Sequence, residues 1–276
     1  MKIAIPKERR AHETRVAASP DTVKKFVGLG LAVQVEKDAG LAASFTDEAY
    51  VAAGATIAKT AAAVYKDADV VLKVARPMTA EEGTDEIALM KKGAVLFSVL
   101  SALTSKDYCE KLAAQGVDAF AMELMPRISR AQSMDVLSSQ SNLAGYKAVI
   151  DAAAEFNHAL PMMMTAAGTV PPARVLVMGA GVAGLQAIAT AKRLGAVVYA
   201  FDVRAAAKEQ VESLGGKFVV VDEEAMKSAE TAGGYAKEMG DEYKKKQAQA
   251  TAEQAAKADI IICTALIPGK PAPVLI

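Results

Sequence analysis

The chain has 276 residues, of which 52% are hydrophobic and 23% charged, a globular balance that excludes intrinsic disorder. Lysine plus arginine equals aspartate plus glutamate, 32 against 32, which argues against direct binding to nucleic acid or to anionic lipid. The first residues are charged where a signal peptide has an apolar core, and no apolar run reaches the roughly 18 residues of a membrane span.

The length is sufficient for two ordinary domains or for one large domain. The two cysteines, Cys109 and Cys263, are far apart and outside any CxxC or zinc-type spacing. We predict that both are buried free thiols in a reducing compartment, and that the chain has no metal site.

In the first half of the chain, short β-rich runs alternate with helical patterns. Strands are predicted at 2–5, 31–36, 69–75, 94–100 and 118–124, and helices at 19–30, 47–54 and 105–116. Ser19 followed by Pro20 indicates a helix start, because serine caps free N–H groups and proline has no N–H to leave unpaired. Gly28 and Gly30 end that helix. The alternation is typical of a parallel sheet covered by helices on both faces.

A polar segment, PRISRAQSMDVLSSQSNLAGY at 126–146, crowds hydrogen-bonding groups between apolar stretches. A long helix is predicted from about Val136 to Leu160, and the prolines at 161, 171 and 172 mark a connection after it. We interpret this helix as a bridge between two domains.

Beyond the prolines the alternation resumes. A strand, a loop and a helix are predicted within 173–196, followed by a strand at 197–203, a helix at 205–214, strands at 217–221 and after Asp259, and a polar helical region between these two. The second sheet therefore has four clear strands, whereas a complete doubly wound sheet has about six. We predict that this domain is truncated, or is completed by something outside the chain.

The sequence VLVMGAGVAG at 175–184 places GxGxxG directly after a predicted strand and at the start of a predicted helix. Gly179 allows the tight turn, Gly181 lets the backbone approach a pyrophosphate, and Gly184 permits close packing of the helix. The free N–H groups at the helix start favour an anion. This context predicts a dinucleotide-binding loop.

Asp202 ends the next predicted strand, close to the spacing of about 20 residues at which a carboxylate accepts from the adenosine ribose hydroxyls. Such a carboxylate repels a 2′-phosphate, so NAD is favoured over NADP, although Arg204 nearby weakens that preference. The residues predicted to bind the cofactor here are Gly179, Gly181, Val182, Ala183, Gly184, Asp202, Val203 and Arg204.

Several segments together resemble a known family: KIAIPKERR, ETRVAASPDTV, DVVLKVARPMTAEE, RISRAQSMD, the glycine loop with its flanks, and AGGYAKEM. Over essentially its whole length the chain resembles the NAD(H)-binding component, domain I, of proton-translocating nicotinamide nucleotide transhydrogenase. The resemblance implies an α/β fold of two Rossmann-like parallel-sheet domains, 1–137 and 138–276. They would be joined by the long helix and separated by a cleft, with a dinucleotide lying across it.

The polar segment has a role by the same resemblance. From composition alone, a polar loop with internally satisfied hydrogen bonds fits equally well. A hydride exchanger must leave the nicotinamide accessible to a second nucleotide, so the ring needs a fixed set of side chains around it. The resemblance implies that Gln132 bridges toward the incoming NADP(H) and that Asp135 holds an arginine. The implied catalytic residues are Arg127, Gln132, Asp135, Ser138 and Tyr235. The implied NAD(H)-binding residues of this segment are Arg127, Ile128, Ser129, Gln132, Ser133, Met134 and Asp135.

The segment ETAGGYAKEMGDEYKKKQ at 230–247 has paired glycines in a small, polar setting, which is typical of a hinge. The resemblance implies a mobile loop that closes over NAD(H) and excludes water, with Gly234, Tyr235 and Gln247 in that role. We interpret the lysine run inside it as a solvated helix face. Leu266 follows the last strand, where doubly wound sheets bind ligands, and is predicted to touch the nucleotide.

The chain is also similar, more distantly, to alanine dehydrogenase. Oxidising an amino acid needs a proton acceptor beside the hydride donor, whereas hydride exchange between two nicotinamides needs none. The alanine dehydrogenase pattern has Arg15 and Lys73 as substrate partners, but its catalytic histidine is replaced here at about Ser101. We interpret His12 and His158 as solvated or packing residues, and Arg15 and Lys73 as relics that are paired with carboxylates.

The transhydrogenase resemblance implies hydride transfer from NADH to NADP⁺ on a separate domain, coupled to proton passage through a membrane domain outside this chain. It also implies a homodimer. The implied location is cytoplasmic and peripheral on the inner membrane through a partner subunit, or the mitochondrial matrix in a eukaryote. An alanine dehydrogenase-like oxidoreductase and a non-catalytic nucleotide-binding regulator are the alternatives.

Overall fold

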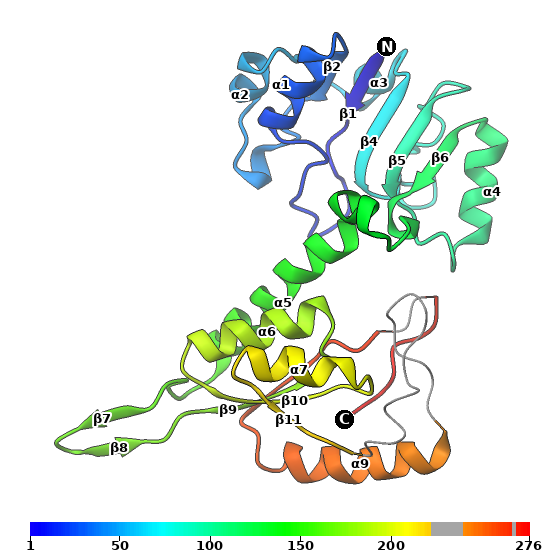
Figure 1. The fold of residues 1–276 in the computed structure, drawn as a ribbon. Coiled ribbons are helices and arrows are strands. Elements are labelled where there is room, and N and C mark those ends of the chain that lie inside the picture. The colour runs from blue at the N-terminus through cyan, green and yellow to red at the C-terminus, as the bar shows by residue number, and fades with distance from the viewer. Residues whose placement is uncertain (222–239, 267–268) are drawn as a thin grey trace. The chain divides into compact units, whose positions relative to one another are not determined.

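The structure is a computed structural model that describes residues 1–221, 240–266 and 269–276 (Figure 1). The chain divides into two compact units, unit 1 (Met1–Asp135) and unit 2 (Val136–Ile276). Each is an α/β unit built on a parallel sheet, as predicted. Within the described ranges, no helix is long and apolar enough to cross a membrane.

Unit 1, all of whose residues are described, has a parallel sheet of six strands. They are β1 (Lys2–Ile5), β2 (Ala32–Glu36), β3 (Thr56–Ala58), β4 (Val70–Ala75), β5 (Val95–Val99) and β6 (Asp118–Ala121). Their order is β3-β2-β1-β4-β5-β6, which places β1 in the middle of a doubly wound sheet. Figure 1 shows β1, β4, β5 and β6 side by side.

The helices of unit 1 start at hydroxyl-bearing residues. They are α1 (Pro20–Gly28), α2 (Asp47–Ala52), α3 (Ala61–Tyr65) and α4 (Lys106–Gln115), with 3₁₀ turns η1 (Leu41–Ala43), η2 (Met122–Leu124) and η3 (Ser129–Met134). Ser19, Thr46 and Thr60 each accept a hydrogen bond from a backbone N–H in the first turn of the following helix. Strand β3 and helix α3 were not predicted, because three and five residues are too few to show a period.

Both faces of this sheet are buried. Ile3 and Ile5 of β1 pack in one hydrophobic cluster with Tyr50 of α2, whereas Ala4 packs in another with Leu96 of β5. Successive residues of a strand point to opposite faces, so the two clusters cover the two sides of the sheet. Such double burial is what a parallel sheet requires.

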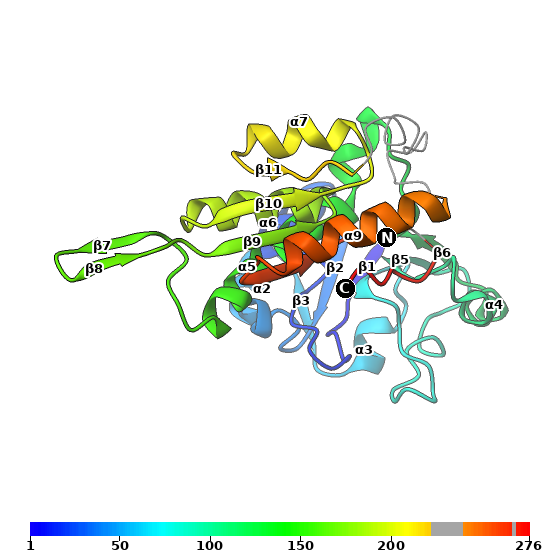
Figure 2. The same cartoon turned by 90° about the horizontal axis from the view of Figure 1, so that it is seen from below.

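Unit 2 begins with the long helix α5 (Val136–Glu155). Its described part then contains β9 (Arg174–Met178), α6 (Val182–Arg193), β10 (Val197–Phe201), α7 (Ala206–Ser213), β11 (Lys217–Phe218), α9 (Asp241–Ala255) and β12 (Ile260–Cys263). The four strands that were predicted form a parallel sheet in the order β11-β10-β9-β12. Helices α6 and α7 lie on one side of these strands and α9 on the other (Figures 1 and 2).

Two boundaries and one additional element in unit 2 differ from the prediction. Helix α5 ends at Glu155 instead of Leu160, because Asn157 and the residue before Pro161 disfavour a helical backbone, so His158 lies beyond the helix. The strand expected at 217–221 pairs only over its first two residues. The proline connection also contains an unpredicted antiparallel hairpin, β7 (Met163–Thr165) and β8 (Gly168–Val170).

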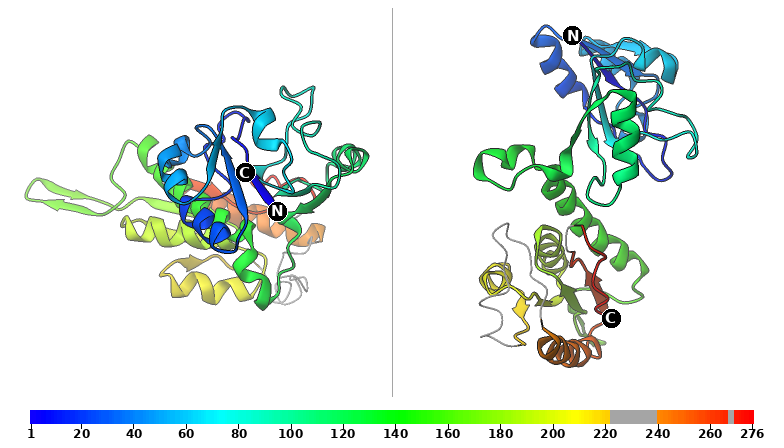
Figure 3. Two further views of the ribbon diagram at one scale, coloured as in Figure 1. Left: turned by 90° about the horizontal axis from the view of Figure 1, so that it is seen from above. Right: turned by 90° about the vertical axis from the view of Figure 1, so that its right-hand side faces the viewer.

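The hairpin extends away from the sheet of unit 2 as an arm (Figures 1 and 3). Met162, Met163, Met164 and Val170 are exposed, Met164 by 73%. Large apolar side chains clustered on one exposed element are unusual for a surface that stays in water.

Candidate functional site

The connection from β9 to α6 is a three-residue turn, Gly179, Ala180 and Gly181. Gly179 has φ +99°, a backbone conformation that side-chain-bearing residues rarely adopt. A Cβ on Gly184 would lie 1.8 Å from the carbonyl oxygen of Gly179, so the helix packs against its own loop only because residue 184 is glycine. These are the roles predicted for the two glycines.

Gly181 differs from its neighbours in the loop. It is the N-cap of α6, with φ −77°, and as a glycine it has no side chain with which to cap the helix. Apart from its two chain neighbours, a Cβ built on Gly181 would meet no atom of the described residues within 4 Å. The absence of a side chain at 181 therefore leaves space in front of the first turn of α6, whose N–H groups have no intrahelical acceptors. A phosphate is the ligand that such N–H groups and the positive end of a 12-residue helix favour.

The body of α6 is held against α5 by a second close approach. A Cβ on Gly145 of α5 would lie 2.0 Å from the carbonyl oxygen of Ala183. The first turn of α6 is therefore packed by backbone contacts on two sides, from Gly179 and from α5. Rigid placement of this turn keeps its N–H groups aimed at one position.

Asp202 lies directly after β10 and beside the loop. Its Oδ2 accepts a hydrogen bond from the Ala180 N–H at 2.7 Å, and the residue is 6% exposed. The Arg204 side chain donates from Nε to Oδ1 and from Nη2 to Oδ2, both at 2.9 Å, and its backbone N–H donates to Oδ1 at 2.9 Å. The predicted carboxylate is therefore at the loop, and it is bound by a guanidinium that spacing alone did not foresee.

Thr264, after β12, completes the loop from its other side. Its hydroxyl donates to the Gly179 carbonyl at 2.8 Å, and its N–H donates to the Met178 carbonyl at 2.8 Å. Thr264 was not predicted from the sequence, since its only signal is a hydroxyl at a strand end. Leu266 follows it and is 65% exposed, so it is available to a ligand.

The polar segment predicted around the nicotinamide lies at the end of unit 1 and the start of α5. Ala131 is buried and anchors η3. The residues in and before η3 that were predicted to contact NAD(H) are exposed: Arg127, Ile128, Ser129, Gln132, Ser133 and Met134. Asp135 and Ser138 are half-buried. The segment thus presents hydrogen-bonding side chains to its surroundings instead of forming a closed polar core.

The segment predicted to be a mobile loop is described only in part. Gly234 and Tyr235 lie outside the described residues. Gln247 was placed in the same loop, but it lies within helix α9 and is half-buried, so its predicted position is corrected. Lys245 and Lys246 are exposed on this helix, which agrees with a solvated face.

Unit 1 has buried ions near the carboxyl ends of its central strands. We name Glu8, Arg9, Glu36, Lys73 and Glu86 the ion cluster. Lys73 donates to both oxygens of Glu86, at 2.9 and 3.0 Å, and Glu86 also pairs with Arg9 at 3.2 Å. Arg9 pairs in turn with Glu36. Lys73 was predicted to be paired with carboxylates, and this is confirmed; Arg15 likewise pairs with Glu13 at 2.7 Å.

Glu8 is the least well satisfied member of the ion cluster. Its Oε1 accepts from the Val74 N–H at 2.7 Å, but its buried Oε2, 3.4 Å from the Lys73 ammonium, has no hydrogen-bond partner in the part of the chain that the structure describes. Burial raises the pKa of the Glu8 carboxyl above its ordinary value, although Lys73 opposes the shift. Three carboxylates surround two cations in the ion cluster.

The two histidines, Ser101 and the two cysteines are the remaining residues that the sequence analysis considered. His12 and His158 are exposed, His158 with its ring 5.5 Å from that of Phe156. Ser101 is exposed in a left-handed turn, with φ 56°. Both cysteines are free, but Cys263 is exposed and Cys109 half-buried, so the prediction of buried thiols is wrong. Cys263 is exposed because it ends β12, the strand at one edge of its sheet.

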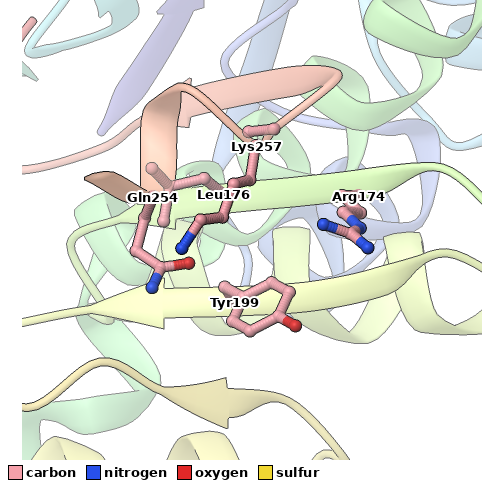
Figure 4. Close-up of a pocket in the computed structure, with 6 residues that line it drawn as sticks. Arg174, Leu176, Tyr199, Gln254 and Lys257 are labelled. Carbon is pink, nitrogen blue, oxygen red and sulfur yellow. The ribbon is translucent and has the colours of Figure 1, made fainter. Parts of the chain in front are cut away.

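A small cavity of about 20 Å³ lies between the sheet of unit 2 and the end of α9 (Figure 4). Its lining residues are Arg174, Leu176, Tyr199, Gln254, Lys257 and Ala258. It has room for about one water molecule and is far too small for a nucleotide. Arg174 and Leu176 belong to β9 before its carboxyl end, so this cavity is separate from the glycine loop.

Comparisons with known proteins cover the whole chain. A family model described as "Alanine dehydrogenase/PNT, N-terminal domain" matches residues 4–144, and one described as "Alanine dehydrogenase/PNT, C-terminal domain" matches residues 148–276. In Rhodospirillum rubrum, a protein named as the first part of NAD(P) transhydrogenase subunit alpha is 73% identical over 276 residues, which are 100% of this chain and 72% of that protein.

Two solved structures extend the comparison. A transhydrogenase from Sinorhizobium meliloti has a TM-score of 0.88 at 54% identity, over 100% of this chain and 73% of that one. An L-alanine dehydrogenase has a TM-score of 0.80 at 28% identity, over 100% of this chain and 69% of that one. The chain therefore belongs to the alanine dehydrogenase/PNT family, on the side of the NAD(P) transhydrogenase alpha subunits.

Proposed function

We propose that this chain is the NAD(H)-binding component of an NAD(P) transhydrogenase, and that hydride passes from its NADH to NADP⁺ on a separate domain. The observation that carries the proposal is the open space at Gly181, in front of the first turn of α6 and beside Asp202. The 73% identity to a transhydrogenase alpha subunit over the whole chain supports this reaction over others.

Several residues of unit 2 bind the adenosine end of NAD(H). The N–H groups of Val182, Ala183 and Gly184 bind the pyrophosphate, because their charge and direction suit an anion. Asp202 accepts from the ribose, with Val203 and Arg204 next to it. The exposed Leu266 side chain packs against the nucleotide, since burying its apolar surface is favourable.

The polar segment contacts the nicotinamide end. Bound NADH supplies the hydride, and exchange with NADP⁺ leaves the number of protons unchanged. Arg127, Ser129, Gln132 and Ser133 need only bind and orient, which is consistent with their exposure and with the lack of a histidine among them. Gln132 reaches toward the second ring, while Asp135 and Ser138 hold the segment. Ile128 and Met134 add apolar contact, and Gly234, Tyr235 and, from helix α9, Gln247 contact the nucleotide.

The assembly also belongs to the proposal. The name of the Rhodospirillum rubrum relative numbers it as one part of an alpha subunit, so we infer a partner with NADP(H) and a membrane domain that couples transfer to protons. The chain would then lie at the membrane surface through that partner. The exposed apolar arm suits a homodimer, in which a second copy covers Met162, Met163 and Met164. Light scattering that gave the mass of one chain for the wild type would refute the dimer.

The reaction is tested by stopped-flow measurement of NADH-dependent reduction of NADP⁺ with the partner domain present. Gln132→Asn should bind NADH with wild-type affinity but transfer hydride about 10- to 100-fold more slowly, because the shortened amide misplaces the rings. Gln210→Asn, the same change at an exposed position of α7 outside the polar segment, is the control. Transfer by Gln132→Asn at the wild-type rate removes Gln132 from the mechanism, and a wild type without transfer refutes the function.

Alanine dehydrogenase activity is the rival within the family. Lys73, which that activity needs for its substrate, is bound through its ammonium to both oxygens of Glu86 and is almost completely buried. We therefore expect no loss of NADH when pyruvate and ammonia are added to the chain alone. Rapid NADH loss under these conditions would favour the dehydrogenase. NADH binding without either reaction would favour a regulator.

A further inference from the structure

The carboxylate of Asp202 has no acceptor position left. An ionised carboxylate offers about four lone-pair sites, two on each oxygen. Oδ1 accepts from the backbone N–H and from Nε of Arg204, and Oδ2 accepts from the Ala180 N–H and from Nη2 of Arg204. With 6% of the residue exposed, little of the group faces solvent.

This saturation conflicts with ribose recognition. Two vicinal hydroxyls that donate to one carboxylate need one lone pair on each of its oxygens. The backbone donors, Ala180 N–H and Arg204 N–H, belong to the loop and to the strand end, so they stay. The two side-chain bonds from Arg204 use one site on each oxygen. They are therefore the pair of bonds that a ribose diol would replace.

The charge of the Arg204 guanidinium affects the selectivity between NAD(H) and NADP(H). While Arg204 is paired with Asp202 at 2.9 Å, the negative charge that repels a 2′-phosphate is compensated. A guanidinium at this position also binds phosphate well, in a bidentate manner. Arg204 thus opposes the ribose of NAD(H) and favours a 2′-phosphate.

We propose that Arg204 determines nucleotide specificity by competing with the adenosine ribose for Asp202, so that NAD(H) binds only after the guanidinium leaves the carboxylate. The proposal rests on the proposed function, since it takes NAD(H) as the ligand. It assigns Arg204 a role opposite to that of a simple ribose contact. Removing its side chain should improve binding of NAD(H).

The test is titration calorimetry of the full chain with NADH and, separately, with NADPH. Arg204→Ala should bind NADH about fivefold more tightly, the factor expected if Arg204 occupies the carboxylate about four-fifths of the time. NADPH should bind at least about threefold more weakly, because the cation beside the 2′-phosphate is gone. Arg204→Gln, which keeps an uncharged amide group as donor, should change both affinities in the same directions by less.

Arg193→Ala is the charge-matched control, because Arg193 is an exposed residue in the last turn of α6. It should leave the ratio of the two affinities unchanged. Thermal melting of each variant shows whether the fold is kept. Unchanged or weaker NADH binding by both folded Arg204 variants overturns the proposal. A wild type that binds no NADH instead refutes the proposed function, so the two failures are distinct.

Discussion

Both units have a parallel sheet, but the connection that follows a central strand differs between them. In unit 1, the chain leaves β1 through a long connection, 6–19, that brings Glu8 and Arg9 into the buried ion cluster. In unit 2, the chain leaves β9 through Gly179, Ala180 and Gly181 alone and reaches the open start of α6. We therefore attribute the proposed nucleotide site of unit 2 to the length and residues of this first connection, since both sheets place a central strand before it.

The two units also differ in what holds their buried carboxylates. The carboxylates of unit 1 hold the cations of their own chain in a buried network, which is costly to break once formed. In unit 2 the buried carboxylate beside the loop is held by Arg204 and by the N–H of Ala180. Unit 1 is therefore expected to respond to changes of charge with changes in stability, and unit 2 with changes in binding.

The largest effect is expected for Glu86→Gln. Glu86 is fully buried and accepts from Lys73, Arg9, the Tyr65 hydroxyl and the Met78 N–H. Without its charge, the buried Lys73 ammonium loses the carboxylate that binds it through both oxygens, and the half-buried Arg9 loses one carboxylate partner. The free energy of unfolding should therefore fall by about 3–5 kcal/mol. Calorimetric unfolding would measure this.

The exposed pair Glu81–Lys111 provides the control for that loss. Glu81→Gln should leave the unfolding temperature unchanged, since a solvated ion pair contributes little. If Glu86→Gln were as harmless as Glu81→Gln, the ion cluster would not be what stabilises unit 1.

A smaller effect of opposite sign is expected for Glu8→Gln. The folded-state pKa of Glu8 is raised by burial, so the native protein binds this proton more tightly than the unfolded chain does. The stability from protonated Glu8 is present below the unfolded pKa of 4.5 and is lost as pH rises through the higher folded value. Glutamine keeps an acceptor for the Val74 N–H and leaves the ion cluster with two carboxylates and two cations.

Glu8→Gln should therefore be more stable than the wild type by about 1 kcal/mol at pH 8, the order of a buried unsatisfied group. The difference should vanish near pH 4. Melting curves of both proteins across this range measure the difference. A variant that is less stable than the wild type at pH 8 would show that ionised Glu8 helps to hold Lys73.

The sequence predicted the parts of this molecule that depend on local rules. Ser19 and Pro20 start α1, and Gly179 and Gly184 fill the roles that their spacing indicated. The four strands of unit 2 followed from alternating apolar runs. In these cases the physical requirement lies within a few residues of the signal.

What could not be predicted depends on contacts between distant residues or on very short elements. The bond from Thr264 to Gly179 joins two parts of the chain with no shared pattern. The Arg204 side chain could have pointed to solvent, and its pairing with Asp202 is a matter of rotamer and burial. The hairpin at 163–170 has exposed methionines, which resemble neither a buried strand nor a loop.

The most direct test of the account is NADH binding by Gly181→Ala, measured by calorimetry on the full chain. A Cβ at 181 meets no atom of the described residues beyond its chain neighbours, and the backbone has φ −77°, so the variant should keep its fold, which thermal melting checks. Gly28→Ala, at the end of α1 with the same free space, is the matched control. We predict that Gly28→Ala binds NADH normally and that Gly181→Ala binds it at least about tenfold more weakly, because the methyl group occupies the approach of the pyrophosphate. Equal binding by both variants would contradict the assignment of the nucleotide to this loop.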